Sequence, residues 1–95
     1  MMTVDVVREV VAAEKRIRSH LSPTELEYSP RLSNLNGGRV YLKLENLQPT
    51  GSFKVRGALN AMLTMDPARR DRGVVASSSG NHGLAIAYGA KTLGA

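Results

Sequence analysis

The spacing of apolar residues changes repeatedly along this chain and predicts alternating helices and strands. Helical spacing covers residues 3–20, about 52–66 and 84–93, and strand patterns lie between these helices at 39–45 and 73–76. Alternating helices and strands are typical of an α/β layer built on a parallel sheet. Because two strands do not complete such a sheet, we expect a partial, open parallel sheet with flanking helices.

Each predicted element has its own pattern. An apolar stripe defines the first helix, which Thr3 can cap, and its members are Val6, Val10, Ala13, Ile17 and Leu21. The second helix has a similar stripe at Val55, Ala58, Leu59 and Met62. Residues 39–45 alternate apolar with polar side chains, whereas 73–76 form an unbroken apolar run that suits a strand buried on both faces. Residues 22–38 are rich in Pro, Gly, Asn and Ser, so we expect a connecting segment there.

The predicted elements fit one small domain at most, because the chain has only 95 residues. We expect an N-terminal helix in 1–21, a connecting segment in 22–38 and a β-α-β-α core in 39–95. The strand at 73–76 and the helix at 84–93 are apolar almost all round and need packing partners that these residues do not supply. We therefore expect residues 1–95 to be the N-terminal portion of a longer protein.

Composition excludes several classes of protein. The chain has no Cys, which excludes disulfides, thiolate zinc sites and thiol catalysis. It has no apolar run long enough for a membrane span, and because the first ten residues include charged ones, we expect no secretory leader there. We therefore expect a cytoplasmic protein.

The net charge of +5 raises the question of nucleic-acid binding. The basic clusters at 15–18 and 69–72 have no aromatic residues between their charges, so bases would have no stacking platform. Solvated helix ends and a turn explain these clusters better than a nucleic-acid interface does.

Lys54 is the most informative residue for function. It follows a turn-rich loop and stands in the first turn of a helix that Ser52 can cap. The positive helix end and Arg56 both disfavour a protonated amine, and Phe53 offers a ring that could stack on a flat ligand. The residues three, four and seven positions after Lys54 are all small: Gly57, Ala58 and Ala61. On spacing alone, an ordinary surface lysine is the better explanation.

A second polar loop, Ser77–Gly83, lies between a predicted strand and a predicted helix. Backbone N–H groups and Ser hydroxyls in that position form an anion site for a carboxylate or phosphate, and ligands of open α/β sheets bind there. An ordinary Ser cap with glycines for tight packing explains the loop equally well. His82 and His20 have no ligands at metal-binding spacing, so we expect no metal site.

The two loops together are far more specific. KLENLQPTGSFKVRGA (43–58), followed by SSGNHG (78–83), resembles the start of fold-type II pyridoxal-phosphate enzymes, whose fold is that of the tryptophan synthase β subunit. Within them the chain is most similar to the threonine/serine dehydratase and serine racemase group. Phe53, the Arg-Gly-Ala at 56–58 and His82 favour this group over cysteine synthases, which usually have Ser-Val-Lys-Asp-Arg and a Thr after the Asn.

This resemblance implies pyridoxal 5′-phosphate as the cofactor and assigns residues to it. Lys54 would hold the cofactor as a Schiff base and later move the α-proton of the substrate. Phe53 would lie against the pyridine ring, and Asn81 would donate a hydrogen bond to the 3′-oxygen. The phosphate cradle and the partner of the pyridine nitrogen would lie beyond Ala95.

The resemblance also implies a small amino-acid substrate and a catalytic pair. The substrate carboxylate would be held by Ser78, Asn81 and His82. Ser79 matches the second acid/base of racemases, on the face opposite Lys54. The implied reaction is β-elimination of L-threonine or L-serine to a 2-oxo acid and ammonia, in a protein that forms a homo-oligomer at full length.

Other functions fit the same residues. An amino-acid racemase of the same group is the nearest alternative, and a dehydratase of ectoine or hydroxyectoine breakdown is another. Two alternatives belong to classes of protein other than enzymes: a truncated, inactive interaction fragment and a small basic nucleic-acid-binding protein.

Overall fold

The computed structural model describes residues 3–95. Its elements, in chain order, are α1 (Val6–Ile17), β1 (Leu26–Tyr28), α2 (Pro30–Asn36), β2 (Tyr41–Lys43), a 3₁₀ turn (Glu45–Leu47), α3 (Lys54–Thr64), α4 (Pro67–Asp71) and α5 (Asn81–Leu93).

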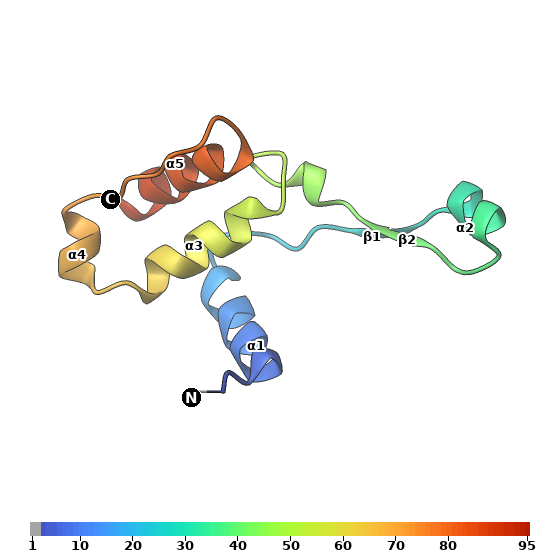
Figure 1. Cartoon of the computed structure of the whole chain (residues 1–95), viewed down its shortest axis with the longest axis horizontal. Helices are drawn as coiled ribbons and strands as arrows, with labels where there is room; N and C mark the ends of the chain where they lie inside the picture. Colours follow the sequence, from blue (N-terminus) through green and yellow to red (C-terminus); the bar gives the residue numbers. More distant parts are fainter. Residues whose placement is uncertain (1–2) are drawn as a thin grey trace.

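The core lies around α3, which packs against both α1 and α5 (Figure 1). The predicted stripe of α3 is confirmed, since all four of its residues are buried. Val55 and Leu59 have no exposed surface. They pack with Ile17 at the end of α1, with Leu21 just after that helix, and with Ala85 of α5.

The N-terminal helix is shorter than predicted and mostly exposed. It begins after Asp5, whose carboxylate accepts a hydrogen bond from the amide of Arg8 at 3.1 Å, so Asp5 and not Thr3 is the cap. Only the end of the predicted stripe reaches the core, because Val6 and Val10 remain 65% and 62% exposed. A hydrogen bond of 2.9 Å from Arg16 Nη1 to Asn60 Oδ1 joins α1 to α3.

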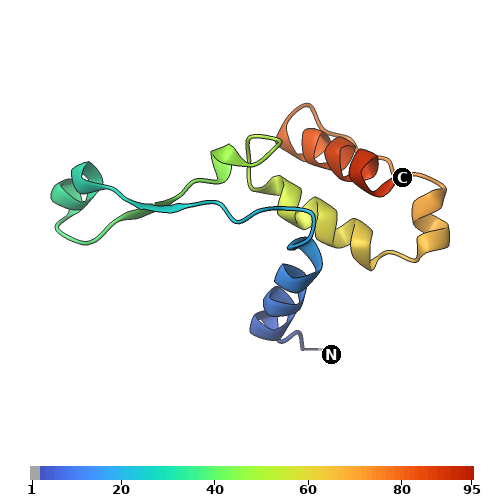
Figure 2. The same ribbon diagram turned by 180° about the vertical axis from the view of Figure 1, so that it is seen from behind.

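The predicted connecting segment contains a strand and a helix that the sequence pattern did not reveal. β1 pairs antiparallel with β2, with Leu26 opposite Lys43 and Tyr28 opposite Tyr41. The two tyrosine rings meet edge to face with centroids 5.4 Å apart. The pair projects away from the helical core and carries α2 at its far end (Figures 1 and 2).

The prediction of a parallel sheet within these residues is wrong. The sheet in residues 3–95 is the antiparallel pair β1–β2, and 73–76 lie in a segment without strand assignment. A strand is stable only when a neighbour satisfies its backbone N–H and C=O groups, and the described residues offer 73–76 no such neighbour. Val75 is accordingly fully exposed.

Two helices near the C-terminus also differ from prediction. α4 was not predicted, and the Asp66 carboxylate caps it by accepting a hydrogen bond from the amide of Ala68 at 3.1 Å. α5 begins three residues earlier than predicted, at Asn81, so both Asn81 and His82 lie in its first turn rather than in the loop.

The described chain is extended. Its radius of gyration is 16.2 Å, whereas a compact domain of this length has about 12 Å. In the part that the structure describes, no helix is both long and apolar enough to span a membrane.

We expect Leu59→Ala to lower the free energy of unfolding of the gene product, read to its natural stop codon, by about 2–5 kcal/mol, since Leu59 is fully buried. Leu35→Ala in α2, at a side chain 75% exposed, is the matched control and should change it by less than about 0.5 kcal/mol. Urea unfolding measures both. Equal losses at the two positions would contradict a core centred on Leu59.

Candidate functional site

Lys54 is the first residue of α3, and its side chain is exposed. The Nζ atom lies over the ring of Phe53, 5.5 Å from the ring centroid. Phe53 is itself 60% exposed and occupies the N-cap position that we predicted for Ser52. The Ser52 hydroxyl accepts a hydrogen bond from the Lys54 amide at 3.4 Å, and the helix begins two residues after Ser52. The amine and the ring therefore form one accessible surface.

The small residues after Lys54 do not all share its surroundings. Gly57 and Ala61 are exposed, and nothing lies within 4 Å of the position that a Cβ atom would occupy on Gly57. Ala58 is buried and belongs to the core instead. Of the three small residues, only Gly57 and Ala61 therefore leave the surface after Lys54 open.

The Ser77–Gly80 segment folds tightly onto the start of α5. The Gly80 amide donates a hydrogen bond to Ser78 Oγ at 3.2 Å. A Cβ atom on Gly83 would lie 3.2 Å from the carbonyl oxygen of Ser78, so a side chain there would push the loop away from the helix.

This loop forms one wall of an open hollow of about 530 Å³. Ser78, Ser79 and Gly80 supply its polar part. Its other wall is apolar and consists of Val74, Ala76, Leu84, Ile86, Ala87 and Ala90. Asn81 and His82 are exposed in the same first turn of α5.

The packing of α3 against α5 brings the two loops to one end of the helix pair. The two helices run in the same direction (Figures 1 and 2). A Cβ atom on Gly89 would lie 3.0 Å from Met62 Cε, which puts these residues in direct contact. Lys54 and Asn81 each stand eight residues before that contact, about 12 Å along either helix. Lys54 and the Ser77–Gly83 segment therefore share one end of the pair.

The turn that leads into α3 is held by the carboxylate of Glu45. Arg56 donates to it through Nε and through Nη2, the latter at 3.1 Å, and forms an ion pair with it. The hydroxyl of Thr24 donates at 2.6 Å and the amide of Gln48 at 3.1 Å. Hydrogen bonds from Arg56 above all, and from Thr24 and Gln48, lower the pKa of Glu45 to about 2, against the opposing effect of desolvation.

Sequence reasoning missed this network. Glu45 looked like an outward residue of a strand, and Arg56 like a charge near Lys54. The pair is separated by eleven positions across an irregular turn, so no helical or strand periodicity connects the two residues.

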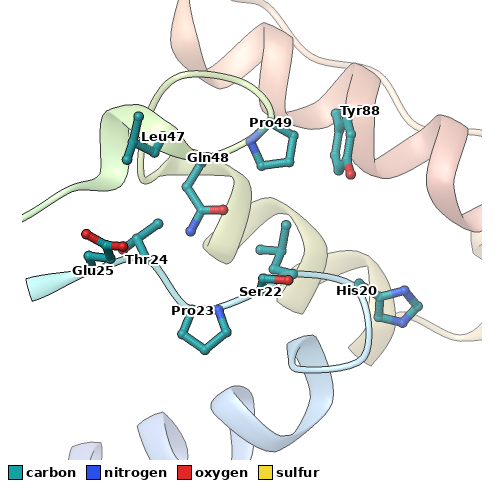
Figure 3. Close-up of a pocket in the computed structure, with 10 residues that line it drawn as sticks. His20, Ser22, Pro23, Thr24, Glu25, Leu47, Gln48, Pro49 and Tyr88 are labelled. Carbon is teal, nitrogen blue, oxygen red and sulfur yellow. The ribbon is translucent and has the colours of Figure 1, made fainter.

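A second hollow, of about 490 Å³, was also unexpected (Figure 3). Three segments line it: 20–25, 47–49 and Tyr88 of α5. It includes Thr24 and Gln48 but none of the predicted site residues. Among residues 3–95, no three His, Asp or Glu side chains cluster closely enough to hold a metal ion.

The sequence model of the pyridoxal-phosphate dependent enzyme family matches residues 17–95. The chain belongs to this family.

Relatives within this family are named for two reactions. The chain is 44% identical over 94 residues to an L-threonine ammonia-lyase of Thermotoga maritima, covering 99% of this chain and 23% of that protein. It is 42% identical over 85 residues to a serine racemase of Dictyostelium discoideum, covering 90% of this chain and 26% of that protein. The chain thus spans about a quarter of the length of these curated relatives.

A solved structure of this family shares the fold. Maize serine racemase superposes with a TM-score of 0.86 at 34% identity, over 93% of this chain and 28% of that one. The predicted α/β class and the resemblance to fold-type II pyridoxal-phosphate enzymes are therefore confirmed. The family's cofactor is pyridoxal 5′-phosphate.

The lowered pKa of Glu45 predicts how stability depends on pH. The ionised carboxylate stabilises the fold above its ordinary pKa of 4.5, and this stabilisation is lost as the pH falls towards 2. Glu45→Gln should therefore lower the free energy of unfolding by about 2 kcal/mol at pH 6 and by much less near pH 2.5. Urea unfolding of both proteins across this range measures the difference. A difference that does not change with pH would contradict the assignment.

Proposed function

We propose that this chain forms the N-terminal part of a pyridoxal-phosphate-dependent dehydratase acting on L-threonine or L-serine. The observation that carries the proposal is the placement of Lys54 and the Ser77–Gly83 loop at one end of the α3–α5 pair. The name of the Thermotoga maritima relative, L-threonine ammonia-lyase, supports the choice of reaction.

The described residues fit the cofactor in three respects. The Lys54 amine is exposed, so an aldehyde can reach it. The exposed Phe53 ring lies beside that amine and offers a flat apolar face to a pyridine ring. Gly57 leaves the space next to the first turn of α3 open. Lys54 would hold the cofactor covalently, and Asn81 would donate a hydrogen bond to its 3′-oxygen.

The substrate would bind at the second loop. Ser78, Asn81 and His82 would hold its carboxylate, because hydroxyl, amide and helix-terminal N–H groups are suitable donors to an anion. When bound, the cofactor withdraws electrons from the α-carbon of the substrate and so makes its α-hydrogen acidic. The Lys54 amine, once free, would accept that proton as a general base.

The overall reaction needs no other reactant. The β-hydroxyl and the α-proton leave as one water. One water is taken up again when the bond between the α-carbon and nitrogen is hydrolysed, and the products are a 2-oxo acid and ammonia. Orientation of the α-hydrogen towards the Lys54 amine is the contribution that the carboxylate-binding residues would make.

Reduction with borohydride tests the assignment of Lys54. The gene product, read to its natural stop codon, is incubated with pyridoxal phosphate, reduced and digested, and the modified peptide is identified by mass. We expect the label on Lys54, its loss in Lys54→Ala, and a fall in L-threonine turnover of about 100-fold or more. Lys91→Ala, at an exposed lysine in the last turn of α5, is the control. It should keep the label on Lys54 and the turnover of L-threonine. A label on another lysine, or none on a folded protein, would overturn the proposal.

A racemase is the second candidate, and Ser79 is the observation that favours it. Ser79 is exposed and lines the hollow beside the carboxylate-binding residues. In a racemase it would return a proton to the substrate on the face opposite Lys54. The maize and Dictyostelium discoideum proteins are both named serine racemases.

Ser79→Ala separates the two candidates. In a racemase, the variant should lower the rate of D-serine formation by about 100-fold, since one of two proton-transfer groups is lost. It should lower pyruvate formation from L-serine far less. Chiral chromatography and a keto-acid assay measure the two rates, and Ser77→Ala is the control in the same loop. Wild-type protein that forms pyruvate without D-serine would exclude the racemase.

Further expectations stay predictions. They include action on ectoine-derived substrates, a role as an inactive interaction fragment, assembly into a homo-oligomer, cytoplasmic location and the absence of nucleic-acid binding.

A further inference from the structure

The carboxylate of Glu45 joins three separate parts of the chain. Its donors come from Thr24 after α1, Gln48 in the turn and Arg56 in the first turn of α3. The side chain of Glu45 is only 17% exposed, and Gln48 is 5% exposed. Four side-chain hydrogen bonds to one partly buried carboxylate form a built junction rather than a chance surface pair.

This junction closes the loop that presents Lys54. Glu45 stands at the beginning of the loop and Arg56 two residues after Lys54, so their ion pair fixes both ends of the intervening segment. Backbone hydrogen bonds from Gly51 to Gln48, at 2.8 Å, and from Arg56 to Phe53, at 3.1 Å, hold the turns inside it. The position of the Lys54 backbone therefore depends on the Glu45–Arg56 pair.

Glu45 acts at a distance from the amine. Side chains two positions apart on a helix point about 200° away from each other, so Arg56 lies on the side of α3 away from Lys54. A carboxylate provides enough acceptor positions for the fork of Arg56 together with two further donors. The isosteric amide of glutamine would turn an N–H group towards the guanidinium and lose this fit.

We propose that Glu45 is a positioning residue for Lys54: its carboxylate fixes Arg56 and Gln48, and thereby sets where the Lys54 amine meets the cofactor aldehyde. The inference rests on the proposed function of Lys54. The step that it controls is the condensation of the Lys54 amine with the aldehyde of pyridoxal phosphate, in which a C=N bond forms and one water is released.

The rate of cofactor capture tests the proposal. The gene product, read to its natural stop codon, is freed of cofactor and mixed with excess pyridoxal phosphate at pH 7.5. Absorbance gives the rate constant and the amplitude of capture, and borohydride reduction with mass analysis gives the labelled fraction at Lys54. We expect Glu45→Gln to slow capture by about tenfold or more at nearly full amplitude, because misplaced reacting groups react more slowly.

Three further single variants and one double variant test the mechanism. Arg56→Gln should slow capture similarly, and the double variant should be no slower than the slower single variant, because the two residues act as one unit. Thr24→Val removes one donor with little change of shape and should slow capture less, so it keeps the test valid if Glu45→Gln does not fold. Glu27→Gln, at an exposed carboxylate in β1, should capture at the wild-type rate.

The outcomes separate this inference from the proposed function. A purely structural role of Glu45 would lower the amplitude and leave the rate constant of the folded fraction unchanged, which would overturn the inference alone. Capture at the wild-type rate in both Glu45→Gln and Thr24→Val would also overturn the inference and leave the proposed function standing. Wild-type protein that acquires no label on Lys54 would remove the proposed function and this inference together.

Discussion

The close contact between α3 and α5 at Gly89 and Met62 is the constraint on which the site depends. A glycine at 89 lets the backbone of α5 lie directly on the Met62 side chain, where a Cβ atom would be only 3.0 Å from Met62 Cε. Together with the rest of the α3–α5 packing, this contact fixes the relative height of two helices that run in the same direction. Because both helices begin the same number of residues before it, their N-termini and the loops that precede them are brought to one end.

A second interaction completes what this packing begins. Helix packing places the first turn of α3 but leaves the irregular loop before it undetermined. The Glu45 carboxylate supplies the missing restraint, because its donors lie on both sides of that loop and on the segment after α1. Apolar packing between α3 and α5 thus fixes how the two helices are aligned. The hydrogen bonds to the Glu45 carboxylate fix the conformation of the loop that leads into α3.

The sequence predicted the parts of the fold that depend on local periodicity. The buried stripe of α3 followed from its spacing, and the polar loop before α5 followed from its Ser and Gly residues. β1 could not be predicted, because three residues show no periodicity and their partner strand lies on the far side of α2. Residues 73–76 were misassigned because a strand-like composition does not supply a neighbouring strand.

The candidate site was predictable to a different extent. Two motifs located Lys54, Phe53 and the Ser77–Gly83 loop by resemblance, and the roles assigned to them remain proposals. The hydrogen-bonded junction at Glu45 could not be predicted from the sequence. It depends on a turn whose geometry brings Glu45 and Arg56 together, and neither residue type is informative at that spacing.

The segment at Val74–Ala76, exposed at Val75 and Ala76, has a consequence for handling this chain. It is apolar and uncharged, Val75 is fully exposed, and within the described residues it has no partner strand. Short β-branched segments with free backbone groups readily pair with copies of themselves. A preparation in which this segment stays uncovered should self-associate as its concentration rises, so purification at low concentration is advisable.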